Sequence, residues 1–391
     1  MTSEWHEVPL RELVGYISKG IAPSYAEEAS ETTIRVLNQK CNRNFRISYG
    51  DSRLHDTLKK KVPPERYVKP DDILINSTGA GTAGRIAQIE DVPSATTIDG
   101  HMTLIRSNGK VTQKFLGYAL KAHQWEVLQL DEGSTGQTEL NRDRLLDEIM
   151  INYPVSFDEQ NAIVGTLEPI DRKLIMNEQL NDNLADLLQT IYQERFGNDI
   201  LAVNQGVLSD ICSYSRDKVA VSELNVITYF STENMLSGKA GSTEATSLPT
   251  TSQTTACHKG DTLISNIRPY FKKIVYCEDK CGCSTDVLCF TPSQPCYSAY
   301  LFSTLYADKF FAFMVAGSKG TKMPRGDKQQ IMTYPVLLPS EEELAGFNTI
   351  ASPLLEQIYS NRAENKRLSI LRDTLLPKLM SGEINVSAVQ L

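Results

Sequence analysis

The sequence GSTGQTELNRD at residues 133–143 returns as GSKGTKMPRGD at residues 317–327, 184 residues further along the chain. The same offset pairs Asn177 with Asn361, and KPDDILIN, which begins at Lys69, is answered later by KGDTLISN. A repeat of this length far exceeds the roughly 20–50 residues of a solenoid unit. The sequence therefore predicts a duplicated domain.

Both halves show the same order of expected elements. Short β-rich segments and a hairpin come first, a helical segment follows at 112–130 or 298–315, and each half ends in a helical block at 158–196 or 341–380. The predicted fold class is α+β, with two similar domains separated by two long antiparallel helices and related by a pseudo-two-fold internal repeat. The predicted boundaries are 1–155 for the first domain, 156–198 for the first helix, 199–339 for the second domain and 340–384 for the second helix.

The helical blocks carry a heptad pattern. In the first block the seam positions alternate steps of four and three, as in a coiled coil. These positions are Ile163, Leu167, Ile170, Leu174, Asn177, Asn181, Leu184, Leu188 and Ile191. If the helices are antiparallel with aligned centres, Asn177 and Asn181 lie opposite Asn361 and Asn365 and would fix the register. Alternatively, the helices meet only in part and the asparagines face solvent.

The composition is that of a soluble globular protein. Of the 391 residues, 41% are hydrophobic and 23% are charged. The N-terminal MTSEWHEVPLREL lacks the apolar core of a secretory signal. The most apolar stretch, 298–318, is interrupted by Asp308 and Lys309, and each side is too short to cross a bilayer. We therefore expect a cytoplasmic protein with no membrane contact.

Seven of the eight cysteines lie in the second half. Cys277, Cys281 and Cys283, with His258 nearby, invite a zinc site, but their C-x3-C-x-C spacing lacks the paired C-x2-C of common structural sites. The matching first-half segment, 89–100, has no cysteine. We expect reduced thiols that pack as small hydrophobic side chains, and no metal bound by this chain.

Known catalytic motifs are not apparent. Gly79, Gly81 and Gly84 have G-x-G-x-x-G spacing, but they lie between two expected strands with no helix after them, unlike a dinucleotide site. Asp71 and Glu90 resemble the start of a nuclease carboxylate pair that lacks its lysine. The sequence favours a non-catalytic protein. A stand-alone DNA-processing enzyme with an unrecognised site and a two-headed protein scaffold stay open as alternatives.

Charge bears on the choice of partner. The formal net charge of −8 is unfavourable for a stand-alone nucleic-acid binder, whose affinity comes mainly from neutralising phosphates. Residues 35–69 nevertheless hold ten basic residues against three acidic ones. A lysine run is usually only a solvated surface, but here asparagine and aromatic residues accompany it. Lysine and arginine contact phosphates, while arginine, asparagine and glutamine also read base edges.

The candidate DNA-contacting residues lie in this basic segment, on the hairpins and on the repeated glycine loops. In the first half they are Lys40, Asn42, Arg43, Asn44, Arg46, Lys59, Lys60, Lys61, Asn76, Ser77, Thr78, Arg85, Ser134, Thr135 and Gln137. In the second half they are Asn266, Arg268, Tyr270, Lys272, Lys273, Ser318, Lys319, Lys322 and Arg325. The glycine loops either meet phosphate through their amides and hydroxyls or serve only as connectors required by the fold.

An ordered series of short motifs runs along the chain. They are Trp5, Val8 and Leu10 near the start; Lys69, Asp71, Ile73 and Leu74 before the hairpin; Gly133, Ser134 and Gly136 in the loop; Pro154 at a strand end; and Glu159, Gln160 and Ile163 at the helix start. In this order they resemble the specificity subunits of type I restriction-modification enzymes, over essentially the whole chain. The second half departs from the pattern, because Gly346 and Phe347 stand where Glu-Gln is expected and no tryptophan lies near Gly206.

The resemblance implies two target-recognition domains, each reading one part of an interrupted, asymmetric double-stranded DNA sequence. It implies that the helices dock two modification (methyltransferase) subunits, and that restriction (endonuclease and translocase) subunits join them. The chain itself would be non-catalytic and bind no cofactor, with S-adenosylmethionine, Mg²⁺ and ATP on the partner subunits. Partners would help to enclose the DNA, which reconciles DNA binding with the net charge of −8.

Overall fold

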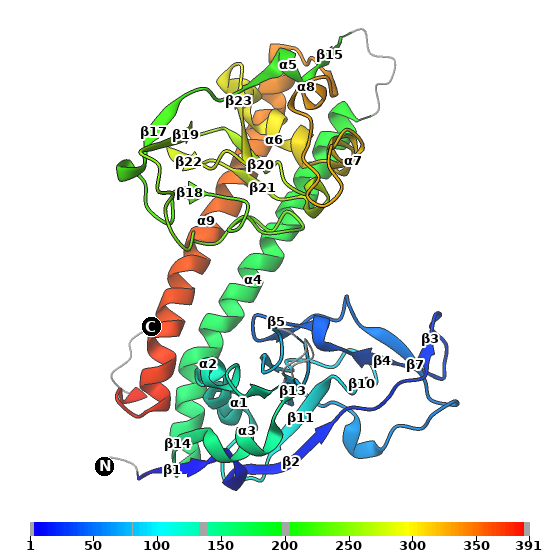
Figure 1. Ribbon diagram of the computed structural model, residues 1–391, viewed down its shortest axis with the longest axis vertical. Coiled ribbons are helices and arrows are strands. Elements are labelled where there is room, and N and C mark those ends of the chain that lie inside the picture. Colours follow the sequence, from blue (N-terminus) through cyan, green and yellow to red (C-terminus); the bar gives the residue numbers. More distant parts are fainter. Residues whose placement is uncertain (1–3, 80, 133–138, 198–203, 387–391) are drawn as a thin grey trace. The chain divides into compact units, whose positions relative to one another are not determined.

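The computed structural model describes residues 4–79, 81–132, 139–197 and 204–386. The chain divides into two compact units (Figure 1). Unit 1 comprises Met1–Leu174 together with Arg367–Leu391, and unit 2 comprises Ile175–Lys366. Each unit is therefore a globular α+β domain plus parts of the two long helices.

The inner sheet of unit 1 contains the predicted hairpin. Its strands are antiparallel in the order β2-β11-β8-β9. They are β2 (Val14–Lys19), β11 (Met102–Ser107), β8 (Ile73–Asn76) and β9 (Ile86–Gln88). Because side chains alternate along a strand, Ile73 and Ile75 join the core that includes the long helices, whereas Leu74 joins a second apolar cluster. The sheet is thus packed on both faces.

Unit 2 repeats this sheet in the order β16-β23-β20-β21. The strands are β16 (Cys212–Tyr214), β23 (Val287–Pro292), β20 (Thr262–Ser265) and β21 (Ile274–Tyr276). Ile264 joins the core that includes the long helices, and Leu263 joins the second cluster. The predicted duplication is confirmed. The two inner sheets share one strand order, and in β8 and β20 alike one face packs on the core of the long helices and the other on the second apolar cluster.

The outer sheets differ between the units. In unit 1 the order is β10-β4-β7-β3, and in unit 2 it is β17-β19-β22-β18. The strands are β10 (Thr96–Ile98), β4 (Thr33–Leu37), β7 (Arg53–Asp56), β3 (Tyr25–Ala26), β17 (Lys218–Ala220), β19 (Gln253–Cys257), β22 (Cys281–Cys283) and β18 (Tyr229–Phe230). Both sheets contain one parallel pair, β4 with β10 and β18 with β22. The sheets differ in which strand of the parallel pair carries the next antiparallel strand. In unit 1, β7 pairs with β4, the earlier strand of the pair in the chain, and in unit 2, β19 pairs with β22, the later strand.

Small strand pairs complete each unit. β1 (Trp5–Pro9) pairs with β14 (Met150–Pro154), and β15 (Gln205–Val207) pairs with β24 (Pro335–Leu337), both antiparallel. Each of these pairs joins the first strand of a domain to its last. Two short ladders in unit 1 are β5 (Asn42–Arg43) with β6 (Arg46–Ile47), and β12 (Asp131–Glu132) with β13 (Glu139–Leu140).

Each domain also contains short helices. They are α1 (Gln113–Ala122), α2 (Gln124–Val127), α3 (Arg142–Glu148), α5 (Leu208–Ile211), α6 (Ser298–Tyr306), α7 (Asp308–Ala316) and α8 (Lys328–Ile331).

Two helical segments predicted as continuous are each broken, the first into α1 and α2 and the second into α6 and α7. The prediction of one helix over 298–315 is wrong because Ala307 has an extended backbone, with ψ 141°. Asp308 then starts α7, where a carboxylate favours the helix N-terminus.

The long helices are α4 (Phe157–Phe196) and α9 (Glu341–Met380), close to the predicted blocks. At 1.5 Å per residue, each is about 60 Å long. In unit 2, Asn177 Nδ2 donates to Asn365 Oδ1 (2.8 Å) and Asn361 Nδ2 donates to Asn181 Oδ1 (2.9 Å). Residue numbers rise on one helix as they fall on the other, so the predicted antiparallel direction is confirmed.

A half-buried carboxylate fixes the two helices to α1 in unit 1. Asp171 on α4 accepts from Tyr118 Oη (3.0 Å), Lys121 Nζ (2.8 Å) and Arg372 Nη1 (3.2 Å). Burial raises the pKa of Asp171, but the two cations outweigh it and hold this pKa below its usual value. For Lys121, burial lowers the pKa more than Asp171 raises it. Asp171 therefore stays ionised between the two cations.

Five of the seven cysteines of unit 2 pack in its second apolar cluster, beside Leu263 and Val275, while Cys212 and Cys296 pack in or against the core that includes the long helices. Cys281 Sγ lies 3.6 Å from Cys277 Sγ, and all eight cysteines of the chain are free thiols. Within the described ranges, no group of three or more histidine, cysteine or acidic side chains is arranged to hold a metal ion. In the same ranges, no helix is both long enough and apolar enough to cross a membrane.

Candidate nucleic-acid interface

In unit 2 the hairpin loop and the repeated glycine loop lie together. Arg268 N–H donates to the Pro324 carbonyl (2.7 Å), and Gly326 N–H donates to the Asn266 carbonyl (3.2 Å). An antiparallel bridge also pairs Ile267 with Arg325. Two segments about 60 residues apart in sequence thus form one surface, which carries most of the second-half candidates.

Unit 1 has the equivalent junction. Leu140 N–H donates to the Ser77 carbonyl (2.8 Å), and a bridge pairs Thr78 with Glu139. Lys19 forms an ion pair with Glu139 beside this junction. In both units, therefore, the end of the glycine loop is hydrogen-bonded to the residues that follow the central strand. The candidates Ser134, Thr135 and Gln137 lie outside the described residues.

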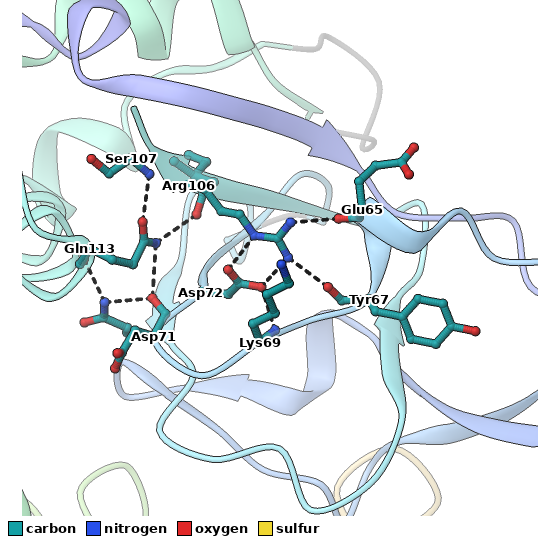
Figure 2. A network of polar contacts seen from close by, with 10 residues as sticks. Glu65, Tyr67, Lys69, Asp71, Asp72, Arg106, Ser107 and Gln113 are labelled. Carbon is teal, nitrogen blue, oxygen red and sulfur yellow. Dashed lines mark hydrogen bonds and ion pairs between the residues drawn. The ribbon is translucent and has the colours of Figure 1, made fainter. Parts of the chain in front are cut away.

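A network of polar contacts holds the start of strand β8, which leads to this loop (Figure 2). Arg106 Nε and Nη2 donate to the two carboxylate oxygens of Asp72, both at 2.7 Å. The same guanidinium reaches the carbonyls of Glu65 (2.9 Å) and Tyr67 (2.8 Å). The hydrogen bond to Asp72 raises the pKa of Arg106. Because Asp72 is 2% exposed, this pairing fixes the strand that presents Asn76 to Thr78.

Three of the first-half candidates are buried and support the loop. Asn42 Nδ2 donates to Asn76 Oδ1 (3.1 Å) and to the Arg85 carbonyl (2.8 Å). Ser77 Oγ lies 2.7 Å from Thr103 Oγ1. These side chains tie the β5–β6 turn to the β8–β9 hairpin.

Other first-half candidates lie at the surface. Lys40, Arg43 and Asn44 are exposed, and Asn44 has a left-handed backbone with φ 52°. Arg46 is half-buried. Thr78 Oγ1 lies 2.8 Å from His101 Nδ1, and Arg85 Nη2 donates to the Gly81 carbonyl (3.2 Å).

The lysine run is anchored to a different part of unit 1. Lys59 Nζ lies 3.9 Å from Asp56, and Lys60 Nζ donates to the Ala22 carbonyl (2.9 Å). Lys61 is exposed. Lys59 thus contacts strand β7 of the outer sheet, and Lys60 contacts the segment before strand β3 of the same sheet. These contacts place the lysine run at the outer sheet and not at the hairpin loop.

Several second-half candidates are neutralised within the protein. Lys272 Nζ lies 3.0 Å from Asp308, Lys319 Nζ lies 2.5 Å from Asp327, and Arg325 Nη2 lies 3.0 Å from Asp286. Lys273 donates to the Thr232 carbonyl (2.5 Å), and burial lowers its pKa. Ser318 Oγ likewise donates to the Val315 carbonyl (2.7 Å). Lys322 is exposed, and among the described residues no acidic group pairs with it.

Sequence reasoning missed three features of this surface. Phe271 and Met323 are exposed apolar residues on the two joined loops. Arg268 and Lys272 have left-handed backbones (φ 50° and 51°), which non-glycine residues seldom adopt. The adjacency of Phe271 to Tyr270 was the one signal in the sequence. The backbone conformation left no signal, because it depends on contacts between distant segments.

The arrangement offers charged and amide donors, exposed aromatic rings and tightly held loops. Residues 2–185 match the family model described as the type I restriction modification DNA specificity domain. The first half of the chain is thus similar to this specificity-domain family. The resemblance predicted from the ordered motifs is therefore confirmed.

Two individual proteins extend the comparison with the specificity-domain family. The MjaIX specificity subunit of a type I restriction enzyme from Methanocaldococcus jannaschii is 34% identical over 73 residues, which is 19% of this chain and 17% of that protein. The matched part is thus about a sixth of that relative. The crystal structure of the S subunit of a type I restriction-modification system from M. genitalium has a TM-score of 0.61 at 18% identity, covering 97% of this chain and 96% of the other. At this identity, the second similarity establishes the fold.

Proposed function

We propose that this chain is the DNA sequence-specificity subunit of a type I restriction-modification complex. Each unit reads one part of an interrupted, asymmetric target in double-stranded DNA. The observation that carries this proposal is the common junction of hairpin and glycine loop in both units, on inner sheets of identical strand order. Since the loops differ in sequence, the two parts of the target differ as well.

The long helices are the proposed docking sites for two modification subunits, which restriction subunits then join. Both helices expose large apolar side chains that a partner would cover. They are Met176, Leu180 and Leu187 on α4 and Ile350, Tyr359, Ile370 and Leu371 on α9. The chain is proposed to be non-catalytic, with S-adenosylmethionine, Mg²⁺ and ATP held by the partners.

The test is co-expression of this chain with its neighbouring modification subunit, followed by mapping of methylated bases in the host genome. The expected result is one methylated motif in two unlike parts separated by an unspecified spacer. Replacing residues 266–273 of unit 2 should alter only one part of the motif, and replacing residues 76–79 of unit 1 should alter only the other. A symmetric or uninterrupted motif would contradict the division of labour between the units.

Two rival functions have distinct signatures in the same material. Purified chain that methylates or cleaves DNA without partners, given methyl donor, Mg²⁺ or ATP, would establish an enzyme in its own right. Assembly with partner proteins but no sequence-dependent DNA binding by the complex would instead favour a two-headed scaffold.

A further inference from the structure

Unit 2 exposes two adjacent aromatic rings at the tip of its hairpin. Tyr270 is 49% exposed and Phe271 is 39% exposed, and their ring centroids lie 4.7 Å apart. Both residues belong to the 3₁₀ helix η5 (Pro269–Phe271), between strands β20 and β21. Two neighbouring aromatic rings outside the core are unfavourable in water, so they mark a surface that a partner covers.

The loop that carries these rings is held rigidly. Arg268 and Lys272 flank it in the left-handed region, and strained backbone of this kind persists only where surrounding contacts enforce it. On one side Arg268 N–H donates to the Pro324 carbonyl (2.7 Å). On the other side, Gly238 N–H donates to the Phe271 carbonyl and Lys239 N–H to the Lys272 carbonyl, at 2.8 and 2.9 Å. The backbone that carries the rings is therefore held in place before any ligand arrives.

The repeated glycine loop, which is hydrogen-bonded to this hairpin, carries a further exposed apolar residue. Met323 is 49% exposed and directly precedes Pro324, whose carbonyl receives the Arg268 hydrogen bond. Basic residues also lie on the two loops. Lys272, Lys319 and Arg325 pair with Asp308, Asp327 and Asp286, whereas Arg268, Lys273 and Lys322 have no ion pair among the described residues. An apolar tip beside this excess of positive charge matches a ligand with a stacked apolar interior and an anionic outside.

Unit 1 has a different tip at the same place. Its loop between β8 and β9 reads STGAGTAGR over residues 77–85 and contains no aromatic residue. The inner sheet that supports the loop has the same strand order in both units. The fold itself therefore does not require aromatic rings at this position, and their presence in unit 2 points to a task specific to that unit.

We propose that Tyr270 and Phe271, with Met323 on the joined loop, form an apolar wedge that enters the base stack of the DNA bound by unit 2. The wedge partly unstacks one base step and kinks the duplex there, as apolar side chains do in other DNA-bending proteins. Flexible steps are the easiest to open, so unit 2 gains selectivity for a step whose base edges it does not touch. This inference rests on the proposed function and adds the mode of readout to it.

The test uses the complex of this chain with its modification subunits and a duplex carrying the mapped target, labelled with a donor and an acceptor dye at its two ends. Wild type should bring the ends closer on binding. Tyr270→Ala and Phe271→Ala should remove most of that change and weaken binding about tenfold or more, yet leave the slope of log affinity against log salt unchanged, because no phosphate contact is lost. Ile227→Ala is the matched control, since Ile227 is a comparably exposed apolar residue of unit 2 (51%), on a turn that leads to the outer sheet.

The outcomes separate the wedge from the underlying function. If wild type binds the target and the two alanine variants bend and bind it equally well, the wedge is wrong and the specificity function stands. If wild type binds no duplex at all, the proposed function fails and the wedge fails with it. If the variants no longer assemble with the modification subunits in size-exclusion chromatography, the rings contact protein and not DNA. The circular dichroism spectra of the two alanine variants should match that of the wild type, because both replaced side chains are exposed.

Discussion

The side-chain amide of Asn361 donates a hydrogen bond of 2.9 Å to the side-chain oxygen of Asn181, joining α9 to α4 within unit 2. Both residues are buried, at 4% and 8% exposure. A buried polar group that loses its partner keeps its desolvation cost, whereas removing both partners is nearly neutral. Polar seam residues of this kind also favour one register over others.

We therefore predict that Asn181→Leu destabilises the protein by about 1–3 kcal/mol, because it strands the Asn361 amide. The double variant Asn181→Leu/Asn361→Leu should recover most of that loss in urea denaturation. If both single variants lose free energy of unfolding and the two losses add in the double variant, the two amides do not depend on one another.

The Asp171 network predicts a dependence on pH. The folded-state pKa of Asp171 lies below its usual value, so its contribution to stability is present above the unfolded aspartate pKa of about 3.9 and is lost as pH falls through the folded-state pKa. Asp171→Asn leaves Lys121 without its carboxylate partner, whereas Arg372 keeps its ion pair with Asp373, and should cost on the order of 2 kcal/mol at neutral pH. The difference between wild type and variant should stay constant above about pH 5 and shrink below pH 4. A difference that persists unchanged at pH 3 would exclude the carboxylate charge as its source.

Two lysines of the repeated glycine loop should differ in their contribution to DNA binding. Lys322 is exposed without an acidic partner among the described residues, whereas Lys319 pairs with Asp327 and lowers the pKa of that carboxyl. In the assembled complex, Lys322→Ala should reduce the slope of log affinity against log salt by about 0.9, the value for one phosphate contact. Lys319→Ala should change it less. Identical slopes for both variants would mean that Lys319 leaves Asp327 when DNA binds.

The hairpin loop of unit 1 requires glycine at position 84. Gly84 has φ +84°, and a Cβ there would lie 2.8 Å from the Val127 carbonyl oxygen. Gly84→Ala should therefore destabilise the protein by about 2 kcal/mol or more. Gly165, on the surface of α4, has no atom within 4 Å of the equivalent position. Gly165→Ala should stabilise by about 0.5–1 kcal/mol, so thermal melts of the two variants should shift in opposite directions.

The long helices could be predicted closely because their signal is regular and local. The seam from Ile163 to Ile191 repeats over four heptads, and α4 and α9 begin and end within a residue of the predicted blocks. The break at Ala307 carries only a short local signal, the Asp308–Lys309 pair that follows it, because apolar residues resume at Phe310. The outer sheets were beyond prediction as well, since their strands have two to five residues and pair with distant segments.

The site could be predicted only to the level of loops. The repeat located the hairpin and the glycine loop, which the structure brings together in both units. Which side chains face outward depends on tertiary contacts. Asn42 and Ser77 look like surface ligands in the sequence but are buried, and Lys272 looks free but pairs with Asp308. The exposed Phe271 looks like a core residue.

The strand pairs β1–β14 and β15–β24 have a consequence for inheritance. Because Trp5 pairs with Pro154 and Gln205 with Leu337, the chain comes into each globular domain and departs from it at one spot, beside the start of a long helix. A gene segment that encodes either domain can therefore be exchanged as a unit. One recombination event on each side of the segment would replace the whole domain and leave both long helices unchanged, so a new variant of this protein would not require a series of point mutations.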